Sequence, residues 1–200
     1  MGDGKETADN EGWERAVWRE PKAFERLFER HANAIFAFCV RRTGDRSAAE
    51  DLMSTTFLHA WRRRADMQPG TDGPLPWLYG IATNLLHRHR RVERRQLDAY
   101  ARSGVNNWVA YEDDAAARIG DSSHGAQLAR ALAAMPPPER DALLLYALAD
   151  LSYDEIACAL DVPVGTVGTW LHRARLTAQH ELATETNALP LATTGADRNE

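Results

Sequence analysis

Apolar residues recur at helical spacing along most of this chain, and this regularity limits the folds that it can adopt. In the first such segment, positions three, four or seven apart form one apolar face: Phe24, Leu27, Phe28, His31, Ile35, Phe38 and Cys39. No segment alternates apolar and polar residues as a half-buried strand would. The sequence therefore predicts an all-α fold.

A first block, over residues 13–96, is expected to hold three helices. The first carries the face described above and ends at a Thr43-Gly44-Asp45 turn. The second covers about 47–64, with an inward face of Ala49, Met53, Phe57, Ala60 and Trp61. After a polar loop at 65–73, Pro74 suits the first turn of the third helix. Its expected buried stripe is Leu78, Ile81, Ala82, Leu85, His89 and Val92.

A second block, over residues 125–185, is expected to hold shorter helices. One helix, at 128–135, stops at three prolines, and another follows at 139–149. Ser152 and Glu155 have the spacing of a capping box, which opens a third helix. Asp161-Val162-Pro163 ends that helix, and a last one covers about 164–182, with Val167, Leu171, Ala174 and Ala178 inward. Residues 97–124 are predicted to be an acidic linker, and 1–12 and 186–200 disordered tails.

Charge is distributed unevenly, and this distribution says more than the net charge of -5. Residues 61–95 hold eight arginines against three acidic residues, whereas residues 125–185 hold four arginines against eight. One basic stripe therefore lies in an otherwise acidic molecule, which favours a nucleic-acid contact there.

Several other classes of protein are disfavoured by what the sequence lacks. It has no glycine-rich phosphate loop, no HExxH or GxSxG motif and no zinc-finger spacing, so no enzyme, metal or cofactor is predicted. Cys39 and Cys158 are expected to be two buried, reduced thiols. No long apolar run or signal peptide is present, so we expect a cytoplasmic protein without membrane insertion.

Residues 151–175 form a candidate helix-turn-helix, in which a short capped helix and a tight turn precede a longer helix. The second helix directs four residues away from its core face, and two more flank them: Gly165, Thr169, His172 and Arg173, with Thr166 and Arg175. Small residues at its first turn would let the backbone approach a phosphate. The alternative is an ordinary helical hairpin.

A second candidate surface lies on the third helix of the first block. Trp77, Asn84, Arg88, Arg91 and Arg95 fall within about 60° of one another at 100° per residue. Arginine binds phosphate, an amide can pair with a base edge, and an aromatic ring can stack on an unpaired base. The alternative is a solvated charged face with Trp77 anchored in the core.

A third candidate surface is the outer stripe of the second helix, formed by Asp51, Ser54, Thr55, Leu58 and Arg62. An exposed leucine among small polar groups could be a partner-docking face. The alternative is a plain surface.

Three segments, in this order, resemble those of the extracytoplasmic-function (group IV) sigma factors, which are members of the sigma-70 family. Residues 51–61 resemble the polymerase-docking helix, 76–84 the start of the helix that engages the -10 element, and 165–175 the -35-reading helix. The resemblance implies a region 2 domain over 13–96, a region 4 domain over 125–185, and a protein that is not an enzyme.

The resemblance also implies the partners and the roles of the three surfaces. The docking face of Asp51, Ser54, Thr55 and Leu58 would bind core RNA polymerase, whose β′ clamp and β flap the family contacts. The second surface would grip promoter DNA at -10, and the last helix would read -35. An anti-sigma factor is a further implied partner. The competing hypotheses are a stand-alone helix-turn-helix regulator and a degenerate relative that titrates an anti-sigma factor.

Overall fold

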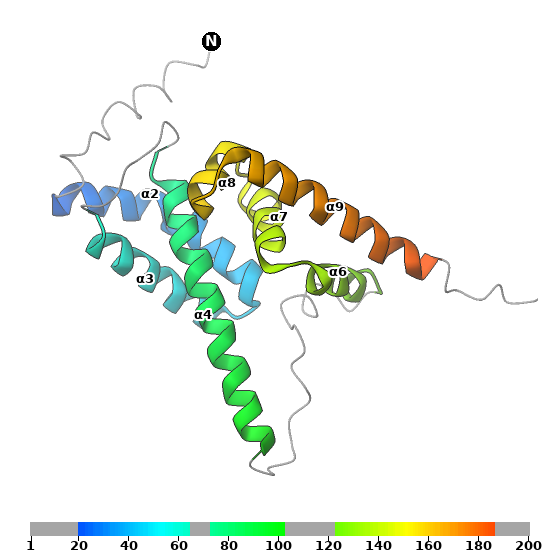
Figure 1. The fold of residues 1–200 in the computed structure, drawn as a ribbon. Helices are drawn as coiled ribbons and strands as arrows, with labels where there is room; N and C mark the ends of the chain where they lie inside the picture. Colours follow the sequence, from blue (N-terminus) through cyan, green and yellow to red (C-terminus); the bar gives the residue numbers. More distant parts are fainter. Residues whose placement is uncertain (1–19, 65–72, 103–122, 187–200) are drawn as a thin grey trace, which may run out of the picture.

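The computed structural model describes residues 20–64, 73–102 and 123–186, and its elements in these ranges are helices (Figure 1). They are α2 (Pro21–Thr43), α3 (Arg46–Arg62), α4 (Leu75–Arg102), α6 (Ser123–Ala134), α7 (Pro137–Ala149), α8 (Tyr153–Leu160) and α9 (Val164–Thr186). The all-α prediction is confirmed. The tails and most of the linker that we predicted lie outside the described residues, and α4 continues past residue 96 into the stretch assigned to the linker.

The turn between α2 and α3 shows how local chemistry sets the helix boundaries. Gly44 has φ 66°, a left-handed conformation that glycine adopts without strain, and its N–H bonds to the Val40 carbonyl at the end of α2. Asp45 then accepts hydrogen bonds from the backbone N–H groups of Ser47 and Ala48, and so caps α3. The predicted Thr43-Gly44-Asp45 turn is therefore confirmed.

Helices α2, α3 and α4 pack together as an N-terminal domain. Its core includes most of the predicted inward residues, but the predicted faces are partly wrong. Leu52 and Leu86 are buried although neither was expected to be, whereas Val92 is 43% exposed and His89 is only partly covered. Val92 is exposed because the C-terminal half of α4 extends beyond α2 and α3 (Figure 1).

Helices α6 to α9 pack together as a C-terminal domain. The predicted capping box opens α8, since Ser152 Oγ accepts from the Glu155 N–H at 3.2 Å and the Ser152 N–H donates to Glu155 Oε2 at 2.7 Å. Asp161, with φ 55°, ends α8 before the turn into α9. Val167, Leu171 and Ala174 of α9 are buried, as predicted, and Ala178 is partly buried.

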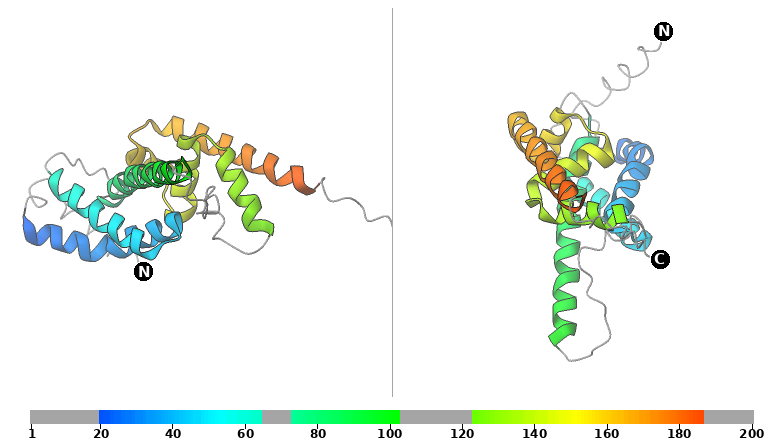
Figure 2. Two further views of the ribbon diagram at one scale, coloured as in Figure 1. Left: turned by 90° about the horizontal axis from the view of Figure 1, so that it is seen from below. Right: turned by 90° about the vertical axis from the view of Figure 1, so that its right-hand side faces the viewer.

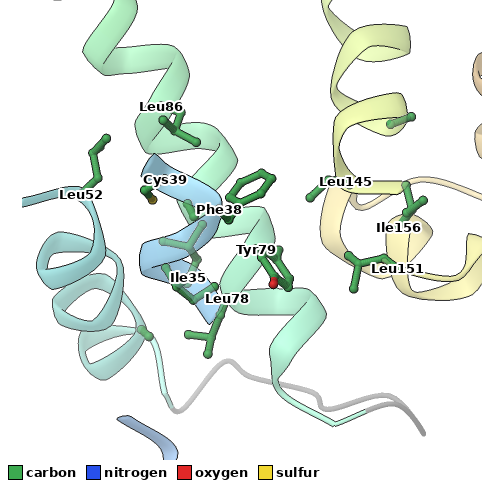
Figure 3. Packing of buried hydrophobic residues seen from close by; sticks show 14 of the residues in the cluster. Ile35, Phe38, Cys39, Leu52, Leu78, Tyr79, Leu86, Leu145, Leu151 and Ile156 are labelled. Carbon is green, nitrogen blue, oxygen red and sulfur yellow. The ribbon is translucent and has the colours of Figure 1, made fainter. Parts of the chain in front are cut away.

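The two domains pack against each other through α4 with α8 and through α2 with α7. One apolar cluster runs through both domains. Figure 3 shows Tyr79 on the side of α4 that faces Leu145, Leu151 and Ile156 of the C-terminal domain. At Gly80 a Cβ atom would lie 2.2 Å from the Ala159 carbonyl oxygen, so only glycine permits this approach of α4 to α8.

The prediction of two buried thiols is half right. Cys39 lies in the core, where burial raises its pKa to about 12, but Cys158 is exposed on α8. The short α8 turns its other face, with Ile156 and Ala157, towards the core. His31 Nε2 is buried and has no hydrogen-bond partner among the described residues.

Candidate nucleic-acid interface

The last part of the basic stripe, from Arg91 to Arg95, lies on a segment of α4 that has no buried face. Each residue from Arg91 to Arg95 is exposed, and Asn84 and Arg88 are exposed as well. Figure 1 and the right-hand view in Figure 2 show the C-terminal part of α4 projecting away from the other helices. A helix segment without a buried face gains no stability from a core, so its side chains are available for contact with a partner.

Charge on this projecting segment is strongly positive. Residues 88–95 contain five arginines and one acidic residue, Glu93, which pairs with His89 at 3.2 Å. Such a density of cations along one helix attracts a phosphate backbone.

Trp77 does not belong with the exposed part of the predicted stripe. Its ring is partly buried and packs against the hydrophobic core, in the first turns of α4 that the other helices cover. The structure thus groups Asn84, Arg88, Arg91 and Arg95 on one exposed side and leaves Trp77 at the start of the same line, partly held by the core.

The predicted reading face of α9 is open to solvent. Gly165, Thr169, His172, Arg173 and Arg175 are exposed and Thr166 is partly buried. A Cβ atom at Gly165 would meet nothing within 4 Å, so the backbone at the first turn of α9 has free space in front of it. This space suits the approach of a phosphate to the N-terminus of a helix.

The side chains on this face are held by neighbours. Thr169 Oγ1 donates to the Gly165 carbonyl at 3.0 Å, and Arg173 lies 3.8 Å from Glu139 of α7. The Arg175 guanidinium stands 5.8 Å from the centre of the Tyr146 ring. α8 packs against α9 across the turn at Asp161, as a helix-turn-helix requires.

The predicted docking face of α3 is exposed at Asp51, Ser54 and Leu58 and partly covered at Thr55. Leu58 is 46% exposed, so its side chain is accessible to a partner. A shallow hollow of about 430 Å³ lies beside this face, lined by Asp45, Ser47, Ala48, Asp51, Leu52, Thr55 and His89.

Sequence reasoning missed a polar cluster at the junction of the domains. Asp141 of α7 is buried and accepts from Arg42 Nη2 at 3.2 Å and contacts His87 Nε2 at 2.5 Å. Arg41 Nη1 donates to the Leu148 carbonyl at 2.5 Å. In the sequence, the only sign of this cluster is that the helical spacing places a charged residue, Asp141, in the core. That spacing does not identify its partner Arg42, which lies 99 positions away.

Two family models match the chain, in the same order as the candidate surfaces. The model described as Sigma-70 region 2 matches residues 27–96, and that described as Sigma-70, region 4 matches residues 125–177. The chain belongs to the sigma-70 family. Sigma factors direct transcription initiation, and the family is not enzymatic.

Relatives narrow the family to the extracytoplasmic-function (ECF) type. The chain is 36% identical over 164 residues to the ECF RNA polymerase sigma factor SigE of Mycolicibacterium smegmatis, covering 80% of this chain and 62% of SigE. It is 34% identical to the RNA polymerase sigma factor CarQ of Myxococcus xanthus, covering 76% of this chain and 84% of CarQ.

Solved sigma factors share the arrangement of helices. The sigma factor RpoE from Bartonella quintana, in complex with the anti-sigma factor NepR, matches with a TM-score of 0.54 and 23% identity over 81% of this chain and 98% of RpoE. CnrH, in complex with the cytosolic domain of CnrY, matches with a TM-score of 0.56 and 22% identity over 85% of this chain and 95% of CnrH. These likenesses concern the fold.

Two further observations concern the described residues. Within the described ranges, no cluster of three or more His, Cys, Asp or Glu side chains could hold a metal ion. None of the helices in the described part of this sigma factor is both long and apolar enough to cross a lipid bilayer.

Proposed function

We propose that this sigma factor binds core RNA polymerase through α3, grips the -10 element through α4 and reads the -35 element through α9. The observation that carries the proposal is the projecting part of α4, which has arginines on several sides and no buried residue from Arg91 to Arg95. An exposed cationic helix without a core function is suited to the phosphates of promoter DNA.

At the -10 element, Asn84, Arg88, Arg91 and Arg95 would hold DNA along one side of α4. The arginines contribute phosphate contacts, and the Asn84 amide offers a donor and an acceptor to a base edge. Trp77 would present only the exposed part of its ring, because the core covers the rest.

At the -35 element, α9 would enter the major groove with its first turns leading. Thr169, His172 and Arg173 are placed to contact base edges, and Gly165, Thr166 and Arg175 to contact the backbone. The pairing of Arg173 with Glu139, and the position of Arg175 near the Tyr146 ring, would orient these guanidinium groups before DNA arrives.

Asp51, Ser54, Thr55 and Leu58 would dock on the β′ clamp of core polymerase, with the β flap meeting the C-terminal domain. An anti-sigma factor is the further partner that we propose, and the two solved sigma factors of similar fold are complexes with protein partners, one of which is named as an anti-sigma factor. The cytoplasm, where RNA polymerase works, would be the site of action.

Simultaneous reading of both elements requires the two domains to separate. The elements lie about 25 base pairs apart, or roughly 85 Å along B-form DNA at about 3.4 Å per base pair. α4, with 28 residues, is about 42 Å long at about 1.5 Å per residue, and α8 packs against it. We therefore infer that the closed arrangement, in which α8 packs against α4 and α7 against α2, opens when the chain reads both elements at once.

The decisive test uses purified chain and bacterial core polymerase in gel filtration, followed by run-off transcription from sheared genomic DNA. We expect co-elution and new, defined start sites. Sequence-specific duplex binding by the chain alone, without co-elution, would instead identify a stand-alone regulator. Failure of both would favour a relative that only titrates an anti-sigma factor.

Paired substitutions assign the roles of α4 and α9 in the same assay. Arg91→Ala with Arg95→Ala is expected to weaken promoter opening at least tenfold while core binding is unchanged, since about two phosphate contacts are lost. Lys22→Ala with Arg26→Ala removes the same charge from exposed positions on α2 and serves as the control. Equal loss of core binding and opening would show that the α4 stripe is misassigned.

Thr169→Ala with Arg173→Ala is expected to reduce initiation from promoters that need the -35 element about tenfold or more, since a good base contact contributes about 1–3 kcal/mol of discrimination. Gln179→Ala, further along the same helix, is the matched control. An unchanged preference for the -35 sequence in the double variant would contradict the recognition-helix assignment.

A further inference from the structure

In the polar contacts that join the two domains, the donors lie on one domain and the acceptors on the other. Arg42 and Arg41 donate to Asp141 and to the Leu148 carbonyl, respectively. His87 Nε2 contacts the other oxygen of Asp141 and is the donor, because an ionised carboxylate can only accept. The N-terminal domain thus supplies the donors, and the C-terminal domain supplies the acceptor oxygens.

Arg42 has more donors than this interface satisfies. Its side chain is 2% exposed, and only Nη2 has the Asp141 carboxylate as a partner. Nε and Nη1 are buried with no hydrogen-bond partner among the described residues. Burial lowers the pKa of Arg42 to about 10, so the guanidinium is still charged at neutral pH. A ligand with more acceptor oxygens than one shared carboxylate would suit it better.

The surroundings of Arg42 are positive. Arg90 and Arg140 act on it by charge repulsion, against the attraction of Asp141, and Arg90 also donates to the Arg42 carbonyl at 3.1 Å. Arg140 belongs to α7 and leaves with the C-terminal domain, whereas Arg90 of α4 stays beside Arg42. The positive charge of Arg42 and Arg90 therefore remains on the N-terminal domain and favours an anionic ligand.

From this geometry we infer that Arg41, Arg42 and His87 form a phosphodiester-binding site on the N-terminal domain, which Asp141 of the C-terminal domain occupies while the chain is closed. We name these three residues the junction site. A phosphodiester, like a carboxylate, carries one negative charge over two non-bridging oxygens and can form a bidentate contact with the fork of a guanidinium. A nucleic-acid strand presents several phosphates in succession, so Arg42 and His87 would not have to share the two oxygens of a single carboxylate.

The position of the junction site favours nucleic acid over an acidic protein segment. His87 lies on α4, next to Arg88 and four residues before Arg91, so the site is continuous with the exposed arginines of that helix. A strand that follows α4 would meet the junction site as soon as the C-terminal domain moved away. The inference rests on the proposed function, in which promoter DNA follows α4.

Competition for Arg42 couples DNA binding to opening of the chain. While Asp141 occupies the junction site, DNA can bind there only in the fraction of molecules that are open, and its apparent affinity is reduced by that fraction. Removing the carboxylate should raise that fraction, because it leaves the charge of Arg42 buried without a partner.

The test measures binding of a single-stranded, mixed-sequence 30-mer DNA to the full chain, without polymerase or promoter sequence, over a range of salt. Asp141→Asn is expected to increase the radius of gyration in small-angle scattering and to tighten DNA binding about tenfold. Adding Arg42→Gln or Arg41→Gln to Asp141→Asn is expected to reduce the slope of log K against log salt by about 0.7, the value for one phosphate on a single strand.

Arg41 is exposed, so its replacement keeps the test valid even if loss of Arg42 unfolds the domain. Arg26→Gln in the Asp141→Asn background, which removes an exposed arginine from the same helix, should leave the slope unchanged. If Asp141→Asn stays closed or misfolds, Gly80→Ala supplies the open background, because a methyl group there collides with Ala159.

An open chain whose DNA affinity and salt slope do not respond to loss of Arg41 or Arg42 would overturn the inference. So would a loss of affinity for core polymerase without a change in the salt slope of DNA binding, since these residues would then serve a protein contact and not a phosphate. Neither result would contradict the proposed function, which is tested separately by promoter-directed transcription.

Discussion

Burial sets the ionisation of individual side chains on α2 in ways that their spacing alone does not show. His31 and Arg42 are both cationic residue types, but burial lowers the pKa of His31 to about 4 and that of Arg42 only to about 10. His31, which also lies near the charge of Arg30, is therefore neutral at pH 7, whereas Arg42 keeps its charge. The same desolvation thus leaves the partly buried His31 uncharged and the fully buried Arg42 a charged ion-pair donor.

Stability should fall with acid because of His31. Its pKa is about 4 in the folded chain and about 6.5 when unfolded, so the unfolded chain binds the proton first between these values. We expect the free energy of unfolding to drop from pH 7.5 to 4.5 by about 1–2 kcal/mol more in the parent than in His31→Leu, a range reduced for partial exposure. Urea denaturation at both pH values checks this, and parallel losses would contradict it.

At the scale of elements, the ends of the helices are set by residues next to them in sequence. Asp45 caps α3, and Ser152 and Glu155 cap each other at the start of α8, which orients α8 for its contact with both α9 and α4. The cap thus serves the helix-turn-helix and the junction of the domains together.

Ser152→Ala should lower the free energy of unfolding of the C-terminal domain by about 1 kcal/mol, since an N-cap side chain contributes about that much. Ser152→Thr keeps a hydroxyl acceptor and is the matched control. Thermal unfolding by circular dichroism provides the measurement, and equal losses in both variants would show that the cap contributes nothing.

At the scale of the molecule, the two domains share one apolar cluster and a buried ion pair, whereas the proposed function requires the domains to separate. Gly80 permits the closed form by allowing α4 and α8 to touch at the backbone. The interface combines Tyr79 packed near Leu151 and Ile156 with the charged contact at Asp141 (Figure 3). Removing one partner from a buried ion pair leaves the other charge buried and unpaired, which is unfavourable. We therefore expect the whole interface between the domains to separate at once.

Gly80→Ala should open the chain without unfolding either domain. Alanine is favoured over glycine within a helix by about 0.5–1 kcal/mol, so α4 itself gains stability, while the new Cβ would stand 2.2 Å from the Ala159 carbonyl oxygen. We expect a larger radius of gyration with unchanged helix content. Gly168→Ala, where the nearest atom is 4.0 Å away, should stay closed. A closed Gly80→Ala chain would show that the interface yields locally.

The sequence by itself determined the helices, their turns and caps, and the three candidate surfaces, because each depends on residues within a few positions of one another. The Ser152–Glu155 box and the turn at Gly44 form as predicted for that reason. The exposed positions of α9 were found equally well from its periodicity.

Only the tertiary structure decided which predicted faces are covered and how the domains meet. Val92 fits the apolar period of α4 but is exposed, since no neighbouring helix reaches the projecting end. Arg42 and Asp141 are buried together although they are 99 positions apart, and Gly80 allows the approach of α4 to α8. Periodicity specifies a face, but the element that covers it is chosen by long-range packing, which local spacing does not encode.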